Sequence, residues 1–109
     1  MTDRELLELA AKAAGIVHYQ SDRPFGSDAP YWNPLTDDGD VARMEAKLGL
    51  NILWTDEHVI AYQRGKSGNP EKYSFHDGDK QKARRYASTK VAAEIARSNE
   101  QIGKGMKDD

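Results

Sequence analysis

The chain has 109 residues, of which 38% are hydrophobic and 31% are charged, and it contains no cysteine. This length fits one domain with a modest core, and the lack of cysteine excludes a disulfide scaffold, a cysteine-ligated zinc site and thiol catalysis. The aromatic residues argue against a disordered chain. No apolar run is long enough for a membrane span or a secretory signal, so we expect a cytoplasmic protein.

The first predicted element is a helix that begins after Thr2 and ends at Gly15. Thr2 and Glu5 fit a capping box, leucines and alanines recur at helical spacing, and glycine is the usual residue just after a helix. The next segment, 18–35, is rich in proline and aromatic residues and is predicted to be a packed loop. The sequence also allows a short strand at 17–20.

A second helix is predicted to begin within 37–40 and to end at Gly49, with an apolar stripe formed by Val41, Met44 and Leu48. The tripeptide Asp-Gly-Asp occurs at 38–40 and again at 77–79. In each case it precedes a predicted helix, which favours a role in helix capping.

Two short apolar segments, 51–55 and 59–63, are predicted to pair as a β-hairpin across the turn Asp56-Glu57. Residues 64–71 then form a basic loop rich in glycine. A third short strand is expected within 72–76, which would extend the hairpin into a meander.

The last predicted helix is the longest, from Lys80 to Ile102, with Gly103 ending it. Together the elements predict an α+β fold: two N-terminal helices, a small antiparallel sheet (a hairpin or a three-stranded meander) and one long C-terminal helix. We expect a single domain at 1–103, followed by a frayed tail at 104–109.

Charge is unevenly distributed along the chain. Residues 1–62 contain 5 Lys and Arg against 11 Asp and Glu, whereas residues 80–107 contain 8 against 2. The acidic half and the basic helix could neutralise each other within one fold, or each could meet a partner of opposite charge.

One candidate site is an acidic surface that would bind a protein with a basic site of its own. Tyr31, in the proline-rich loop, is a further candidate contact, whereas its neighbour Trp32 is assigned to the core. The acidic candidates are Asp37, Asp38, Asp40, Glu45, Asp56 and Glu57.

A second candidate site is a nucleic-acid surface on the last helix. Cations there could follow a phosphate backbone, and a tyrosine could stack on a base. The same face could instead contact the acidic half of the chain or lie in solvent. The residues that helical spacing places on this face are Lys82, Tyr86, Lys90 and Arg97.

No arrangement of residues typical of an enzyme is evident. None of the serines lies in a nucleophile elbow, and the aspartates around Gly39 lack the ligand alternation of a calcium loop. His76, Asp77 and Asp79 could hold a divalent metal for a hydrolase, but neighbouring residues on one turn rarely complete such a site. We therefore expect no enzyme activity, no cofactor and no metal.

Two segments carry a resemblance to a known group of proteins. The opening residues 1–15 (MTDRELLELAAKAAG) and the block 31–40 (YWNPLTDDGD) resemble small uncharacterised proteins of tailed bacteriophages and prophages, and the helix at 84–103 is similar more loosely. The resemblance implies a phage origin and the cytoplasm of a bacterial host. It implies no established activity, and so no catalytic residues.

From these observations we expect a small, non-enzymatic phage accessory protein that binds a host macromolecule. An inhibitor of a host defence system, such as an anti-CRISPR protein, is one version of this hypothesis. A nucleic-acid-binding phage regulator that uses the basic face is the alternative. The expected partner is a host protein or nucleic acid, with no membrane contact. Since the core is small, a homodimer through the last helix is also expected.

Overall fold

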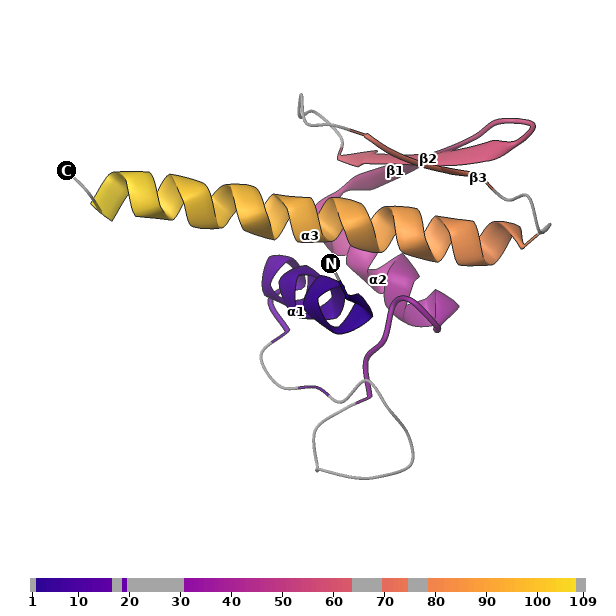
Figure 1. The fold of residues 1–109 in the computed structure, drawn as a ribbon. Helices are drawn as coiled ribbons and strands as arrows, with labels where there is room; N and C mark the ends of the chain where they lie inside the picture. The colour runs from indigo at the N-terminus through magenta and orange to yellow at the C-terminus, as the bar shows by residue number, and fades with distance from the viewer. Residues whose placement is uncertain (1, 17–18, 20–30, 64–69, 75–78, 108–109) are drawn as a thin grey trace.

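The computed structural model describes residues 2–16, 19, 31–63, 70–74 and 79–107, and for 100–107 it describes the helix without its side chains. The chain order is α1 (Asp3–Ala14), α2 (Asp38–Leu48), β1 (Leu50–Trp54), β2 (His58–Gln63), β3 (Glu71–Ser74) and α3 (Lys80–Lys107). The sheet, α3, and the pair of helices α1 and α2 form three stacked layers, with α3 in the middle (Figure 1). The predicted α+β fold is confirmed.

Helix α1 begins and ends as its sequence predicts. The hydroxyl of Thr2 accepts a hydrogen bond from the backbone N–H of Glu5 at 3.2 Å. At the other end Gly15 adopts a φ of 74°, and its N–H bonds to the carbonyl of Lys12 while that of Ile16 bonds to Ala11. These bonds satisfy carbonyl groups that the helix itself leaves open.

Helix α2 is capped by Asp37, which lies just before the Asp-Gly-Asp tripeptide. Its carboxylate accepts the backbone N–H of Asp40 at 2.8 Å, so the tripeptide forms the first turn. The helix ends at Gly49, whose φ of 68° is in the left-handed region that favours glycine. The predicted start and end of the helix are therefore confirmed, whereas the tripeptide at 38–40 lies inside the helix and the cap is the residue before it.

The three strands form an antiparallel meander in the order β1-β2-β3. Ile52 of β1 lies opposite Ala61 of β2, and Val59 of β2 lies opposite Tyr73 of β3. The third strand is confirmed, although it begins at Glu71, and the last two residues of the predicted 72–76 segment lie outside the described residues. The predicted strand at 17–20 also falls largely outside them.

Helix α3 runs further than its sequence predicts. Its first turn is capped by Asp79, whose carboxylate accepts the backbone N–H of Lys82 at 2.9 Å. The prediction that Gly103 ends the helix is wrong, because the helix continues to Lys107 and includes the start of the expected frayed tail. A glycine inside a helix costs only about 1 kcal/mol relative to alanine, so it does not by itself end one.

The proline-rich loop is described from Tyr31 onward, and there it is packed as predicted. Trp32 is 7% exposed, and its ring meets that of Tyr19 edge to face with centroids 5.3 Å apart. Pro34 and Leu35 are buried as well. The assignment of Trp32 to the core is confirmed.

The core is divided in two by α3. One cluster joins α1 and α2 to α3 through leucines, alanines, Met44 and Trp32. The other joins the inner face of the sheet to α3 through Val59, Ala61 and their neighbours. Because alanines such as Ala87 and Ala93 are fully buried on α3, both layers can approach its backbone closely.

Replacing Ala93 with leucine should therefore destabilise the protein. The extra atoms have no space between α1 and α3, and overpacking of this kind costs about 1–3 kcal/mol in the free energy of unfolding. Ala46→Leu, at an exposed position of α2, is the matched control. It should change the free energy of unfolding by less than about 0.5 kcal/mol. Urea unfolding checks both, and equal stabilities would contradict the close packing of α3.

Candidate functional site

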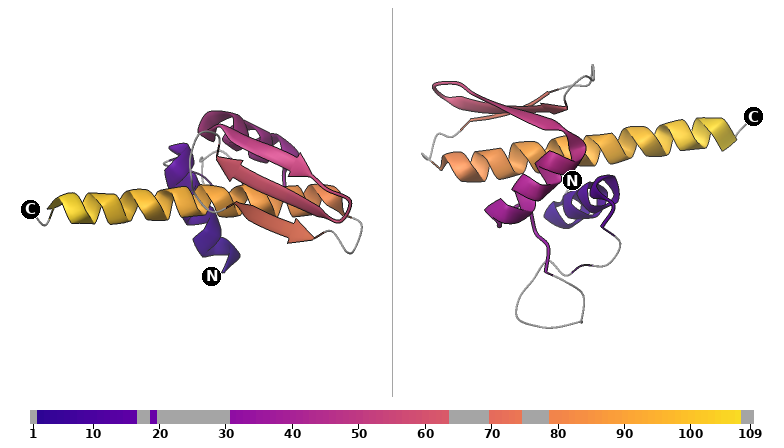
Figure 2. Two further views of the ribbon diagram at one scale, coloured as in Figure 1. Left: turned by 90° about the horizontal axis from the view of Figure 1, so that it is seen from above. Right: turned by 180° about the vertical axis from the view of Figure 1, so that it is seen from behind.

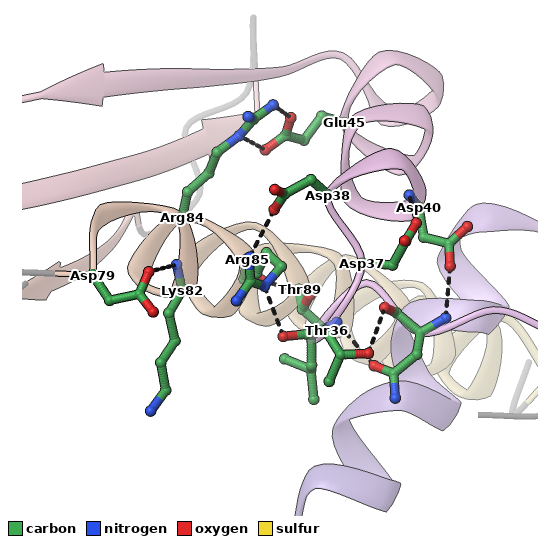
Figure 3. A network of polar contacts seen from close by, with 12 residues as sticks. Thr36, Asp37, Asp38, Asp40, Glu45, Asp79, Lys82, Arg84, Arg85 and Thr89 are labelled. Atoms are coloured by element: carbon green, nitrogen blue, oxygen red, sulfur yellow. Dashed lines mark hydrogen bonds and ion pairs between the residues drawn. The ribbon is translucent and has the colours of Figure 1, made fainter. Parts of the chain in front are cut away.

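A buried carboxylate joins α2 to α3. Glu45 is 7% exposed, and it accepts hydrogen bonds from Arg84 at 3.1 and 2.5 Å (Figure 3). It also accepts one from the hydroxyl of Ser88 at 2.5 Å. The hydrogen bond that Arg84 donates to Glu45 also raises the pKa of the Arg84 guanidinium, against the effect of burial. Glu45 is thus committed to a contact inside the chain.

A second ion pair joins the same two helices near the start of α2. Arg85 contacts the carboxylate of Asp38 at 2.7 Å and donates to the backbone carbonyl of Leu35 at 2.9 Å. The hydroxyl of Thr89 in turn donates to the carbonyl of Arg85 at 2.7 Å. These contacts fix the end of the proline-rich loop against α3 (Figure 3).

The third carboxylate organises the loop that precedes α2. Asp40 is 4% exposed, accepts the backbone N–H of Asn33 at 2.9 Å and pairs with Arg43 at 2.6 Å. The side chain of Asn33 accepts the N–H of Leu35 at 3.0 Å, which stabilises a turn. The polar residues in the block at 31–40 thus have a structural explanation.

The predicted acidic surface is therefore not one surface. Asp38, Asp40 and Glu45 are engaged by arginines or backbone groups, and Asp37 caps α2. Tyr31 is half-buried, with its hydroxyl 3.1 Å from that of Thr36. Two ion pairs, Arg84 with Glu45 and Arg85 with Asp38, thus join the acidic half to the basic helix within the fold.

The remaining acidic candidates lie elsewhere, at the turn between β1 and β2. Asp56 and Glu57 are exposed there and make no ion pair with the described residues. They lie at the end of a hairpin that also carries the large hydrophobic side chains most exposed in the described part of the chain. These are Leu53 at 51%, Trp54 at 43% and Tyr62 at 38%.

The outer face of the sheet explains the exposure of Leu53 and Tyr62, whereas Trp54, opposite Val59, lies on the inner face. Side chains alternate between the two faces of a strand, so Leu53, Ile60 and Tyr62 share the face opposite to Val59 and Ala61. All three helices lie on the inner side of the sheet, and no described element covers the outer one (Figures 1 and 2). We name Leu53, Ile60, Tyr62, Asp56 and Glu57 together the hairpin surface.

Three of its five residues were not among the sequence candidates. The alternation along 51–55 separates Leu53 from Ile52 and Trp54, so the sequence does indicate which residues share a face. It does not indicate which face the helices cover. That information comes only from the packing of α3 against Val59 and Ala61.

The basic candidates do lie together along α3, but carboxylates lie beside most of them. Tyr86 donates its hydroxyl to Asp3 at 2.8 Å, and this bond, with burial, raises the pKa of Tyr86. Arg97 lies 3.3 Å from Glu94. Burial raises the pKa of the Glu71 carboxyl, and Lys90 is close enough to oppose that rise, whereas Lys82 is exposed. This face is therefore less positive than its sequence predicts.

A pocket of about 320 Å³ lies where β3 meets the start of α3. The rings of Tyr73 and Tyr86 line it with centroids 6.1 Å apart, and Lys82 and Asp79 lie at its polar side. Ser74 contributes to the lining, and its buried hydroxyl has no hydrogen-bond partner among the described residues. The pocket thus combines two aromatic rings with one cation and one carboxylate.

The metal candidates can be placed only in part. His76 and Asp77 lie outside the described residues, and Asp79 caps α3. Among the residues that the structure describes, no three His, Asp or Glu side chains are grouped so that they could hold a metal ion.

Comparisons of the chain with protein-family models, curated proteins and solved structures found no match. None of the helices in the described ranges has the length and apolar character needed to cross a membrane. The exposed surfaces of the fold are therefore the features from which a function can be inferred.

Removing the buried carboxylate should destabilise the fold. In Glu45→Ala, Arg84 and Ser88 lose their acceptor in a partly buried site, which should lower the free energy of unfolding by about 1–3 kcal/mol. Glu57→Ala removes an exposed acid and should change it by less than about 0.5 kcal/mol. Chemical unfolding measures both, and equal effects would contradict the structural role of Glu45.

The stability contributed by Glu71 should depend on pH. Burial raises the pKa of this carboxyl, Lys90 opposes the rise, and Glu94 adds to it. A raised pKa in the folded state means that stability falls as pH rises through that pKa. The stability of Glu71→Gln relative to wild type should therefore increase from about pH 4 to about pH 7. A difference that stays constant across urea unfolding curves at these pH values would contradict this assignment.

Proposed function

We propose that the chain is a small, non-enzymatic phage accessory protein that binds a host protein through the hairpin surface. A component of a host defence system is the partner we favour, so that the protein would act as an inhibitor in the manner of an anti-CRISPR protein. The resemblance of residues 1–15 and 31–40 to phage proteins supports the origin. The hairpin surface supports the mode of action.

The observation that carries this proposal is the exposure of apolar side chains next to acids that make no ion pair with the described residues. Leu53 and Tyr62 expose 51% and 38% of their surface on a sheet face that no described helix covers. Exposed apolar groups that lie together on a small protein are typical of a binding site. Asp56 and Glu57 stand at the rim of this site, where charge sets orientation and association rate.

The chemistry of the partner follows from this arrangement. It would offer an apolar recess for Leu53, Ile60 and Tyr62, bordered by lysine or arginine side chains for Asp56 and Glu57. Such a combination occurs where a protein carries a basic surface for nucleic acid. The acids of α2 take no part, because Asp38, Asp40 and Glu45 are held within the fold.

Variants of the hairpin surface should lose the partner. A tagged protein expressed in a bacterial host is expected to retain a specific protein after nuclease treatment, identified by mass spectrometry. Tyr62→Lys, and separately Asp56→Lys with Glu57→Lys, should reduce the retained amount at least about tenfold, a loss of about 1.4 kcal/mol in binding. The reversal of two exposed acids on α1, Glu5→Lys with Glu8→Lys, is matched in charge and should leave retention unchanged.

Three results would overturn the proposal. One is a partner retained equally by all the variants, and another is the retention of no protein at all. The third is retention that disappears with nuclease, since this would favour the basic face of α3 and the nucleic-acid alternative. In that case substitution of Lys82 and Lys90 should reduce the salt dependence of binding.

A further inference from the structure

One edge of the sheet lacks the features that normally prevent strands from pairing with other chains. β1 lies at the margin of the sheet, and its sequence, LNILW, contains no charge and no proline (Figure 2). The opposite edge strand, β3, carries Glu71 and Lys72 and follows Pro70. Charges and proline are common protections of edge strands, so among the described strands β1 is the edge that carries neither.

The hydrogen-bond pattern shows which backbone groups this edge offers. The N–H of Thr55 bonds to the carbonyl of His58 at 2.9 Å, so this pair is a hydrogen-bonded one. Hydrogen-bonded and non-hydrogen-bonded pairs alternate along an antiparallel ladder. The next hydrogen-bonded pair is therefore Leu53 with Ile60. The N–H and C=O of Ile52 point the other way, toward the open edge. Ile52 is also the middle residue of the five in β1.

We propose that a second copy of the chain pairs with this edge, β1 against β1, in antiparallel orientation about a two-fold axis at Ile52. When the N–H and C=O of the middle residue of a strand point to the open edge, the strand can pair over its whole length with the same strand of a second copy. Leu50 of each copy then lies opposite Trp54 of the partner subunit, on the inner side. The two meanders become one continuous sheet of six strands.

The side chains and charges of β1 and its flanks suit a second copy. On the inner side, Leu50 would cover part of the Trp54 ring of the partner subunit, which is 43% exposed in the single chain. In an antiparallel pair the start of one strand lies beside the end of the other, so Lys47, which precedes β1, and Glu57 of the partner subunit, which follows it, lie at the same end of the contact. Both are exposed, and Lys47 makes no ion pair with the described carboxylates. The contact is thus apolar in the middle and opposite in charge at both ends.

The last helix, which the sequence suggests as the dimer contact, is less suited to this role. Its apolar stripe at Ala83, Ala87 and Val91 is buried against the sheet of its own chain. Edge pairing leaves the outer sheet face open and places the two copies of it side by side. The dimer therefore goes beyond the proposed function, and it is tested on purified protein without any partner.

The test is the mass of the full-length protein in solution. Light scattering over a concentration series should show a rise from 12.2 kDa toward twice that value. Leu53→Lys places a charge on the edge strand and should raise the dimer dissociation constant about tenfold or more. Tyr62→Lys puts the same charge on the same sheet face, but on the central strand β2, and should leave the mass unchanged.

A charge exchange tests the antiparallel orientation of the two strands. Lys47→Glu should weaken the dimer, and adding Glu57→Lys to the same chain should restore it. Hydrogen exchange on the unaltered protein gives a readout that needs no variant. The amide of Ile52 should exchange more slowly at high protein concentration, whereas that of Lys72, on the outer edge of β3, should not change.

Several outcomes would overturn edge pairing. A mass of one chain at every concentration would do so. A dimer that survives Leu53→Lys with its fold intact, or one that Tyr62→Lys abolishes instead, would point to another contact. Exchange of the Ile52 amide that does not depend on protein concentration would also overturn edge pairing.

Discussion

The fold depends on a single helix that serves two cores at once. The side of α3 that carries Ala83 and Ala87 packs on the sheet, and the opposite side, with Ala92 and Ala93, packs on α1 and α2. Two layers can share one helix only if its side chains are short enough for close approach on both sides. This requirement explains how a chain with few large apolar residues still buries two clusters.

The position of α3 also decides what happens to the charges. The side of the helix that faces α2 carries Arg84 and Arg85, and these meet Glu45 and Asp38. A partly buried carboxylate needs such partners, because its desolvation would otherwise be costly. Charges that looked like a binding surface along the sequence are therefore used to hold two helices together.

The same architecture leaves the sheet covered on one face only. With all three helices on the inner side, Leu53 and Tyr62 stay exposed, and β1 stays at an open edge (Figure 2). The acids nearest to this uncovered hairpin, Asp56 and Glu57, have no partner among the described residues. Apolar surface, open backbone groups and unneutralised charge thus coincide at the part of the fold furthest from α1.

The sequence by itself determined the local structure. Thr2, Asp37, Gly15 and Gly49 set helix ends through capping and positive φ, which depend on near neighbours alone. The prediction from sequence was wrong at Gly103, because the helix continues through this residue to Lys107.

Only the tertiary structure decided which surface is free. Whether an acid is neutralised depends on residues far along the chain: Arg84 pairs with Glu45, whereas no described residue pairs with Asp56. Burial of Val59 and exposure of Leu53 likewise follow from the face that α3 covers, and helical or strand periodicity does not specify that choice.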